Sequence, residues 1–226
     1  MGNNTSITEH KRHYYRELLC IGVPIIIGQL GTIILGFADT LMIGHHSTEE
    51  LAAAGLVNNI ITFILVSYMG FSYGLTPIIG KLYGMEKTDK IGQKVKNSFF
   101  ANMVVGVIFS LALIILYFNL HRIGQPEELL ALIRPYFIVN LISVLFVGVF
   151  NTLKQFLDGI GNTKVAMWVM IMGNIVNIFG NWVLIYGVGP CPEMGLLGAG
   201  ISTLASRVLM AVAMVGIIVG TKEYRE

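Results

Sequence analysis

Charged residues are scarce in this sequence. Lys, Arg, Asp and Glu make up only 12% of the 226 residues, whereas they make up about 25% of an average soluble domain. Hydrophobic residues account for 54%, and the mean hydropathy is +0.72. These values argue against a soluble globular domain and predict an integral membrane protein.

Cysteines and metal-binding patterns are also sparse. The sequence has two cysteines, Cys20 and Cys191, and we expect no disulfide because they fall on opposite faces of the predicted membrane domain. His45 and His46 are adjacent rather than spaced along one helix face, so we interpret them as solvated interfacial residues and expect no metal centre. Neither a phosphate-binding Gly loop nor a nucleophile elbow is present, so we expect neither an enzyme nor a bound cofactor.

Six apolar runs are long enough to cross the hydrocarbon core as helices, or within two residues of that length. The shortest lies between Arg134 and Lys154, whose long side chains we expect to extend towards water. Ser47 with Glu50 resembles a capping box, GNTK and GVGPCPEMG are predicted turns, and no run alternates like a membrane barrel strand. The sequence therefore predicts an all-α bundle of six transmembrane helices, at 18–43, 51–79, 98–120, 136–153, 165–188 and 195–220.

Lys and Arg are distributed unevenly around these spans. Twelve lie on the side of the two termini, and only Arg122 and Arg134 lie among the other loops and helix ends. Because positive residues near helix ends resist translocation, both termini are predicted to be cytoplasmic. We divide the chain into a cytoplasmic tail (1–17), a six-helix domain (18–220) and the start of a cytoplasmic linker (221–226). The net charge of +2 follows from this topology and does not indicate a nucleic-acid partner.

One carboxylate interrupts the first apolar run. The segment GQLGTIILGFADTLMIG, residues 28–44, contains Asp39 and no basic residue. A charge at the centre of a bilayer costs about 2.5–3.5 kcal/mol even on the lenient insertion scale, so such residues usually have a function. With the N-terminus inside, Asp39 belongs to the outer half of the membrane, and the alternative reading is a carboxylate wetted from outside.

Three asparagines lie on one face of the fifth span. Asn174, Asn177 and Asn181 are spaced i, i+3, i+7, and Trp182 follows directly. The structural alternative is ordinary hydrogen bonding between helices, which contributes under about 1 kcal/mol per pair in membranes. We interpret Asn177, Asn181 and Trp182 as cavity-lining residues and leave both readings open for Asn174.

Further polar residues occupy the first, second and sixth spans. Pro24 predicts a bend in the first helix, where it removes a backbone hydrogen bond. Arg207 lies near the middle of the sixth span and needs a carboxylate, a carbonyl or a water-filled cleft, and Asp39 is the one intramembrane carboxylate available. A direct pair is possible only if their depths match. The other candidates for a substrate cavity are Gln29 of the first span and Tyr68, Ser72 and Tyr73 of the second. For the three residues of the second span, packing in the bundle core is the alternative.

Several long motifs resemble one transporter family. GVPIIIGQLGTIILGFADTLMIGHHSTEELAAAGL is similar to the first helix and outer turn of the multidrug and toxic compound extrusion (MATE) transporters. LKQFLDGIGNTKVAMWVMIMGNIVNIFGNWVLIYG resembles their fifth helix with the loop before it, and GLLGAGISTLASR resembles their sixth. The resemblance implies secondary antiport, in which drugs, organic cations or other amphipathic compounds leave across the cytoplasmic membrane in exchange for H⁺ or Na⁺.

The resemblance also implies a cation-coupling site. Asp39 matches the carboxylate of the family's first helix, Asn177 and Asn181 match polar positions of the fifth, and Thr203 matches a hydroxyl of the sixth. Where many members have a second carboxylate, this chain has Asn181, so coupling to H⁺ and to Na⁺ both stay open.

Members of the family are about twice as long, with two six-helix lobes around a central cavity. The chain therefore resembles an N-terminal half, and its expected partners are the bilayer, a xenobiotic substrate, and either a second lobe or a second copy of itself. A lipid-linked oligosaccharide flippase of the same superfamily and a non-transporting assembly partner are the alternatives. A membrane enzyme would need paired catalytic residues at a common depth, and none is present.

Overall fold

The computed structural model describes residues 3–224, and the side chains of residues 15–222 and 224. Every regular element in this part of the chain is helical, as predicted. The main helices are α1 (Asn3–His46), α2 (Thr48–Tyr73), α3 (Leu75–Gly84), α4 (Ile91–Phe118), α5 (Glu127–Gly159), α6 (Thr163–Tyr186) and α7 (Gly195–Gly220). Three short 3₁₀ turns join or follow them, η1 (Thr88–Lys90), η2 (Leu120–Ile123) and η3 (Lys222–Tyr224).

Six helical segments within the described residues are long and apolar enough to cross a membrane. They coincide with the six predicted spans, with α2 and α3 forming one segment that is interrupted at Gly74. The helix of the first span begins much earlier than the apolar run, because α1 already starts at Asn3. Residues assigned to the N-terminal tail therefore continue this helix.

The fourth span is much longer than predicted. α5 extends from Glu127 to Gly159 and includes both residues that were taken as its limits. Arg134 is exposed, but the ammonium group of Lys154 bonds Asp158 Oδ2 at 2.6 Å, one turn further along the same helix. Because both side chains are almost completely buried, the prediction that Lys154 extends into water is wrong.

The predicted turns and the start of α2 after Ser47 are confirmed, but Glu50 bonds His46 and does not complete the predicted capping box. The Ser47 hydroxyl accepts hydrogen bonds from the backbone N–H groups of Glu49 and Glu50, which satisfies free donors of the first turn of α2. α6 ends where Gly187 adopts a left-handed conformation with φ of 65°. Cys20 and Cys191 are both free, as expected.

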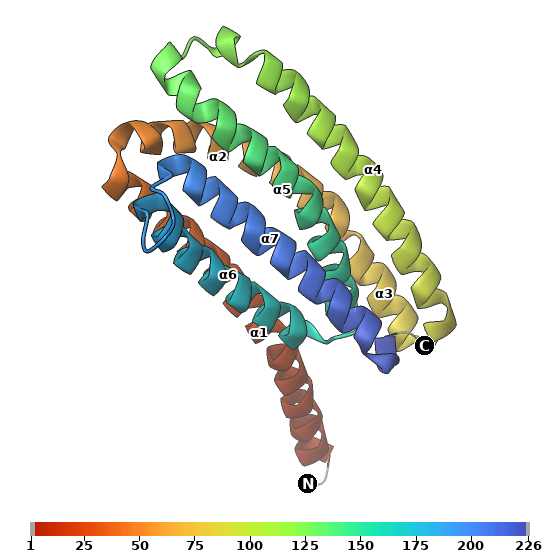
Figure 1. Ribbon diagram of the computed structural model, residues 1–226. Coiled ribbons are helices and arrows are strands. Elements are labelled where there is room, and N and C mark those ends of the chain that lie inside the picture. The colour runs from red at the N-terminus through yellow and green to blue at the C-terminus, as the bar shows by residue number, and fades with distance from the viewer. Residues whose placement is uncertain (1–2, 225–226) are drawn as a thin grey trace.

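The helices form one bundle (Figure 1). α1 packs against α6, α6 against α7, and α7 against α5, while α4 packs against α5 and α2 on the other side. The N-terminal part of α1 extends beyond the other helices in Figure 1, and the helix changes direction along its length. Pro24 lies inside α1 and accounts for a bend of this kind, because it removes one backbone hydrogen bond.

Two apolar clusters fill the bundle. One lies around Tyr68, Ile133 and Phe137, and the other around Ile79, Leu157 and Met214. Many large apolar side chains on the outer surface are exposed, among them Ile33, Phe63 and Phe100. Such a surface is suited to lipid, in agreement with the membrane prediction.

Replacing Gly148 of α5 by Ala should destabilise the bundle. The new methyl group would collide with the ring and hydroxyl of Tyr68, which is completely buried and cannot move aside. We expect a loss of about 1–3 kcal/mol, the usual cost of overpacking a core, visible as a lower midpoint of thermal unfolding in detergent. Gly216→Ala is the matched control, because nothing lies within 4 Å of its new methyl group. Equal midpoints for the two variants would contradict this packing.

Candidate functional site

Asp39 meets Asn181 where α1 packs against α6. The Asn181 side-chain amide donates a hydrogen bond of 2.6 Å to Asp39 Oδ1. Asn181 is completely buried, and Asp39 is half-buried. Further along the same interface, Gly28 and Gly31 of α1 face Met170 and Asn174 of α6. Because these two glycines have no side chain, the helices can approach closely there.

The hydrogen bonds continue from Asn181 into α7. The same amide group donates to Asn177 Oδ1 at 3.1 Å, and the Asn177 amide donates to Thr203 Oγ1 at 3.1 Å and to Ser206 Oγ at 3.4 Å. The structure thus brings together all four predicted coupling residues, Asp39, Asn177, Asn181 and Thr203. We call them, with Ser206, the Asp39 network.

One acceptor in this network lacks a partner. Asn181 Oδ1 is buried, and no hydrogen-bond donor lies within reach among the described residues. A buried amide oxygen without a donor costs about 1–3 kcal/mol. The position therefore favours a state of the site in which a proton donor or a cation reaches this oxygen.

Arg207 projects from the middle of α7 towards α5. Its guanidinium donates a hydrogen bond to Ser143 Oγ, and Ser143 donates in turn to the Asn140 backbone oxygen at 2.6 Å. No ion pair joins Arg207 to Asp39 in the described part of the chain. Arg207 is thus a half-buried cation near the Asp39 network with a neutral primary partner.

Tyr68 and Ser72 occupy the packed core instead of a cavity. The Tyr68 hydroxyl donates to the Asn102 backbone oxygen at 2.8 Å, and the Ser72 hydroxyl donates to Asn102 Oδ1 at 2.6 Å. Both side chains are at most 1% exposed. The structure contradicts their assignment as cavity residues, because their hydroxyl groups form hydrogen bonds that join α2 to α4.

The remaining candidates make no side-chain hydrogen bond to the Asp39 network within the described residues. Gln29, Tyr73 and Trp182 are exposed on the surface of the bundle, where Trp182 packs against Phe179. Asn174 is half-buried and faces Gly31 of α1, and its side chain makes no hydrogen bond with described residues.

Comparison with known proteins decides the family. A sequence profile of the MatE family matches residues 24–183. The chain belongs to the MatE family. Its members are membrane transporters, not enzymes.

Curated relatives of this MatE protein are multidrug resistance proteins by name. A probable multidrug resistance protein NorM of Photorhabdus laumondii is 32% identical over 210 residues, which cover 93% of this chain and 46% of the relative. The multidrug resistance protein NorM of Photobacterium profundum is 27% identical, with 95% and 47% covered. The chain therefore spans about half the length of the curated relatives it matches.

Solved structures share the fold of this MatE chain. A MOP superfamily transporter from Pyrococcus furiosus, described as having a binding pocket of reverse polarity, superposes with a TM-score of 0.82 at 22% identity, covering 92% of this chain and 45% of that one. A multidrug resistance MATE transporter in an outward-facing conformation gives 0.80 at 23% identity, with 88% and 44% covered. The six-helix bundle thus matches one half of a MATE structure.

Ser202 and Ser206 also belong to the site of this MatE chain, although they were not predicted as site residues. Ser202 donates to the Asn177 backbone oxygen at 2.8 Å, and Ser206 accepts from the Asn177 amide. Ser202, Thr203 and Ser206 share a helix face, which was a usable signal, but hydroxyl groups in membrane helices often bond only to their own backbone.

Asn177→Ala should destabilise the MatE bundle more than Asn174→Ala. The first change removes the amide that joins Asn181 to Thr203 and Ser206, whereas the second removes an amide without such a bond. We expect a difference of about 1 kcal/mol, within the range for hydrogen bonds between membrane helices, measured by thermal unfolding in detergent. Similar losses for both variants would mean that the network adds no stability.

Proposed function

We propose that this chain is one lobe of a multidrug antiporter of the cytoplasmic membrane, and that Asp39 binds the coupling ion, H⁺ or Na⁺. The observation that carries the proposal is the contact between Asp39 and Asn181, with an unpartnered amide oxygen beside it. An ionisable group that faces the interior of a membrane bundle marks an ion pathway more often than a purely structural contact.

The Asn181 amide supports a simple exchange mechanism. In the described state it donates N–H to Asp39, which suits an ionised carboxylate. When Asp39 takes up a proton it becomes a donor, and Asn181 Oδ1 is then the matching acceptor once the amide turns over. The buried oxygen that lacks a partner in one state acquires one in the other.

Oxygen ligands for Na⁺ are available at the same place. The Asp39 carboxylate, Asn181 Oδ1, Asn177 Oδ1 and Thr203 Oγ1 belong to one hydrogen-bonded network, and hard cations prefer oxygen ligands. Without a second carboxylate at Asn181, Asp39 supplies the one negative charge of this network. Binding of either ion neutralises it.

Export follows if neutralisation of Asp39 repacks α1. The charge keeps α1 bonded to α6 while the carboxylate is ionised, and Pro24 lets the helix change its bend without breaking further backbone bonds. Substrate and coupling ion then oppose each other's binding, as linkage requires. Gln29 and Trp182 stay our predicted substrate contacts, and Arg207 sets the local charge of the cavity.

A second lobe completes the proposed transporter. Because the chain matches about half of its relatives, we infer that its transport-competent form pairs it with a C-terminal lobe or with a second copy. A six-helix lobe returns to the side from which it started, so two such lobes can be related by an axis along the membrane normal.

Asp39→Asn should abolish ion binding by the purified chain. With Trp168→Phe as background, Trp182 remains as a fluorescent reporter next to Asn181. We expect Na⁺ or a fall in pH to change the emission of Trp182. In Asp39→Asn, the part of this change that depends on ion binding to Asp39 should be lost. Asp89→Asn, the same substitution on the exposed turn η1, is the control. An unchanged response in Asp39→Asn would exclude Asp39 as the ion site.

In the two-lobed transporter, Asp39→Asn should also stop the efflux of ethidium driven by an H⁺ or Na⁺ gradient, while Asp89→Asn transports normally. Efflux that persists in Asp39→Asn would show that coupling lies elsewhere. Efflux that needs no ion gradient in either protein would contradict antiport.

The two native cysteines test the predicted orientation. Cys20 lies on α1 towards its N-terminal end, and Cys191 lies in the loop between α6 and α7. With the termini inside, a membrane-impermeant maleimide added to intact cells should label Cys191 and leave Cys20 unlabelled until the membrane is opened. Labelling in the reverse order would invert the topology.

A further inference from the structure

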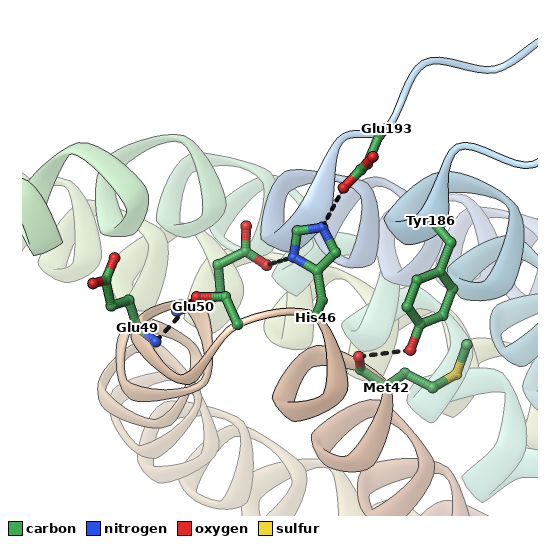
Figure 2. A network of polar contacts seen from close by, with 7 residues as sticks. Met42, His46, Glu49, Glu50, Tyr186 and Glu193 are labelled. Atoms are coloured by element: carbon green, nitrogen blue, oxygen red, sulfur yellow. Dashed lines mark hydrogen bonds and ion pairs between the residues drawn. The ribbon is translucent and has the colours of Figure 1, made fainter.

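His46, the last residue of α1, lies between two carboxylates. Its Nδ1 is 2.8 Å from Glu50 Oε2, in the first turn of α2, and its Nε2 is 2.8 Å from Glu193 Oε1, in the loop between α6 and α7. Figure 2 shows the imidazole ring between the two acidic groups. We call these three residues the His46 clasp. The interpretation of His46 as a freely solvated residue was therefore wrong.

The clasp has the geometry of a protonated histidine. An ionised carboxylate accepts hydrogen bonds and donates none, so both ring nitrogens must carry hydrogen to make both contacts. The end of α1 also favours a positive charge, because carbonyl groups without partners face outwards there. Tyr186 of α6 places its ring beside His46, with the two centroids 6.3 Å apart, and adds no charge.

Four segments are tied together at this end of the bundle. The clasp joins the end of α1, the start of α2 and the α6–α7 loop, and the Tyr186 hydroxyl adds a hydrogen bond of 2.9 Å to the Met42 backbone oxygen. The fit is tight, since a Cβ at Gly195 would strike the Glu50 carboxylate. A Cβ at Gly187 would lie 2.7 Å from the Glu193 backbone nitrogen.

The clasp lies directly above the Asp39 network. Asp39 and His46 are seven residues apart on α1, which places them on the same face at a separation of about 10 Å along the axis. Ile43, only 1% exposed, lies between them. The loop that the clasp ties to the end of α1 joins α6 and α7, the two helices that form the Asp39 network together with α1.

We propose that the His46 clasp is a proton-sensitive gate at the predicted outer end of the lobe, closed over the Asp39 network while His46 is protonated and released when it is not. The inference rests on the proposed function, because the gate controls access to the proposed ion site. The protonated clasp has a net charge of −1. Loss of one proton gives −2 and leaves one ring nitrogen lone pair facing a carboxylate, so one of the two contacts turns from attraction to repulsion while the other nitrogen still donates.

The first test uses Cys191, two residues before Glu193, as a reporter of the loop. Cys20 is first replaced by Ser. The rate at which Cys191 reacts with a methanethiosulfonate reagent is then compared between the otherwise wild-type protein and His46→Gln at the same pH. At one pH, ionisation of the thiol affects both rates equally. At about pH 6 we expect the wild type to react about two- to fivefold more slowly, the range for an ion pair with one exposed partner. At about pH 8.5, above the ordinary histidine range near 6.5, the two rates should converge.

His45→Gln is the matched control. His45 is the neighbouring residue, but it is exposed and makes no side-chain hydrogen bond with described residues, so this variant should follow the wild type at both values of pH. Glu193→Gln is a second variant on an exposed loop side chain and should behave as His46→Gln does. A rate ratio that does not change with pH would overturn the proposed sensitivity to protons.

The second test asks whether the clasp covers the ion site. With Cys20 and Cys191 both replaced by Ser, Thr203→Cys places a thiol in the Asp39 network, and the same reagent reports its access to water. His46→Gln should speed this reaction at about pH 6 and not at about pH 8.5. If the loop is released but the rate at residue 203 is unchanged, the clasp is not a gate. Because neither test measures transport or ion binding, both can succeed even if Asp39 proves not to be the coupling site.

Discussion

The hydrogen bond between Asp39 and Asn181 is the contact on which the rest of the site depends. Hydrocarbon offers no water to a carboxylate, so Asp39 can remain in α1 only where another helix brings a donor to it. Asn181 does so, but it must in turn be held by Asn177, and Asn177 by the hydroxyl groups of α7. One charge therefore determines how α1, α6 and α7 are rotated against one another.

The same constraint operates elsewhere in the bundle with different partners. Arg207 is bonded to a serine of α5, and Tyr68 and Ser72 are bonded to Asn102 of α4. Each polar group of the spans is a potential functional residue when seen in sequence. The structure separates those whose hydrogen bonds are complete, such as Tyr68, from Asn181, which keeps a free acceptor. Ser110, Gln155 and Asp158 also have a buried polar atom without a partner among the described residues, but of these four residues Asn181 is the one that bonds the carboxylate of α1.

Much of this could be predicted from the sequence. The six spans follow from hydropathy, and the shared face of Asn177 and Asn181 follows from helical spacing, because both are local properties of the chain. The length of α5 could not be predicted from its charges, since Lys154 is neutralised by a partner within the same helix. Neither could the surroundings of Tyr68 or His46, because Asn102 and Glu193 come from distant parts of the chain. Local patterns indicate which residues need partners, whereas the tertiary fold decides which partners they have.

Asp158 and Asp39 differ in when their hydrogen-bond partners become available during synthesis. Asp158 bonds a lysine four residues away, so α5 can neutralise its own charges as soon as it becomes helical, before any other helix is beside it. Asp39 depends on a residue 142 positions later in the chain. α1 must therefore enter the bilayer with an unsatisfied carboxylate and wait for four further spans to be made before α6 can join it. Asp39 is paired only after the fifth span has been made, and Asn177 finds its α7 partners only with the sixth, so the first helix to enter is among the last to be fixed in place.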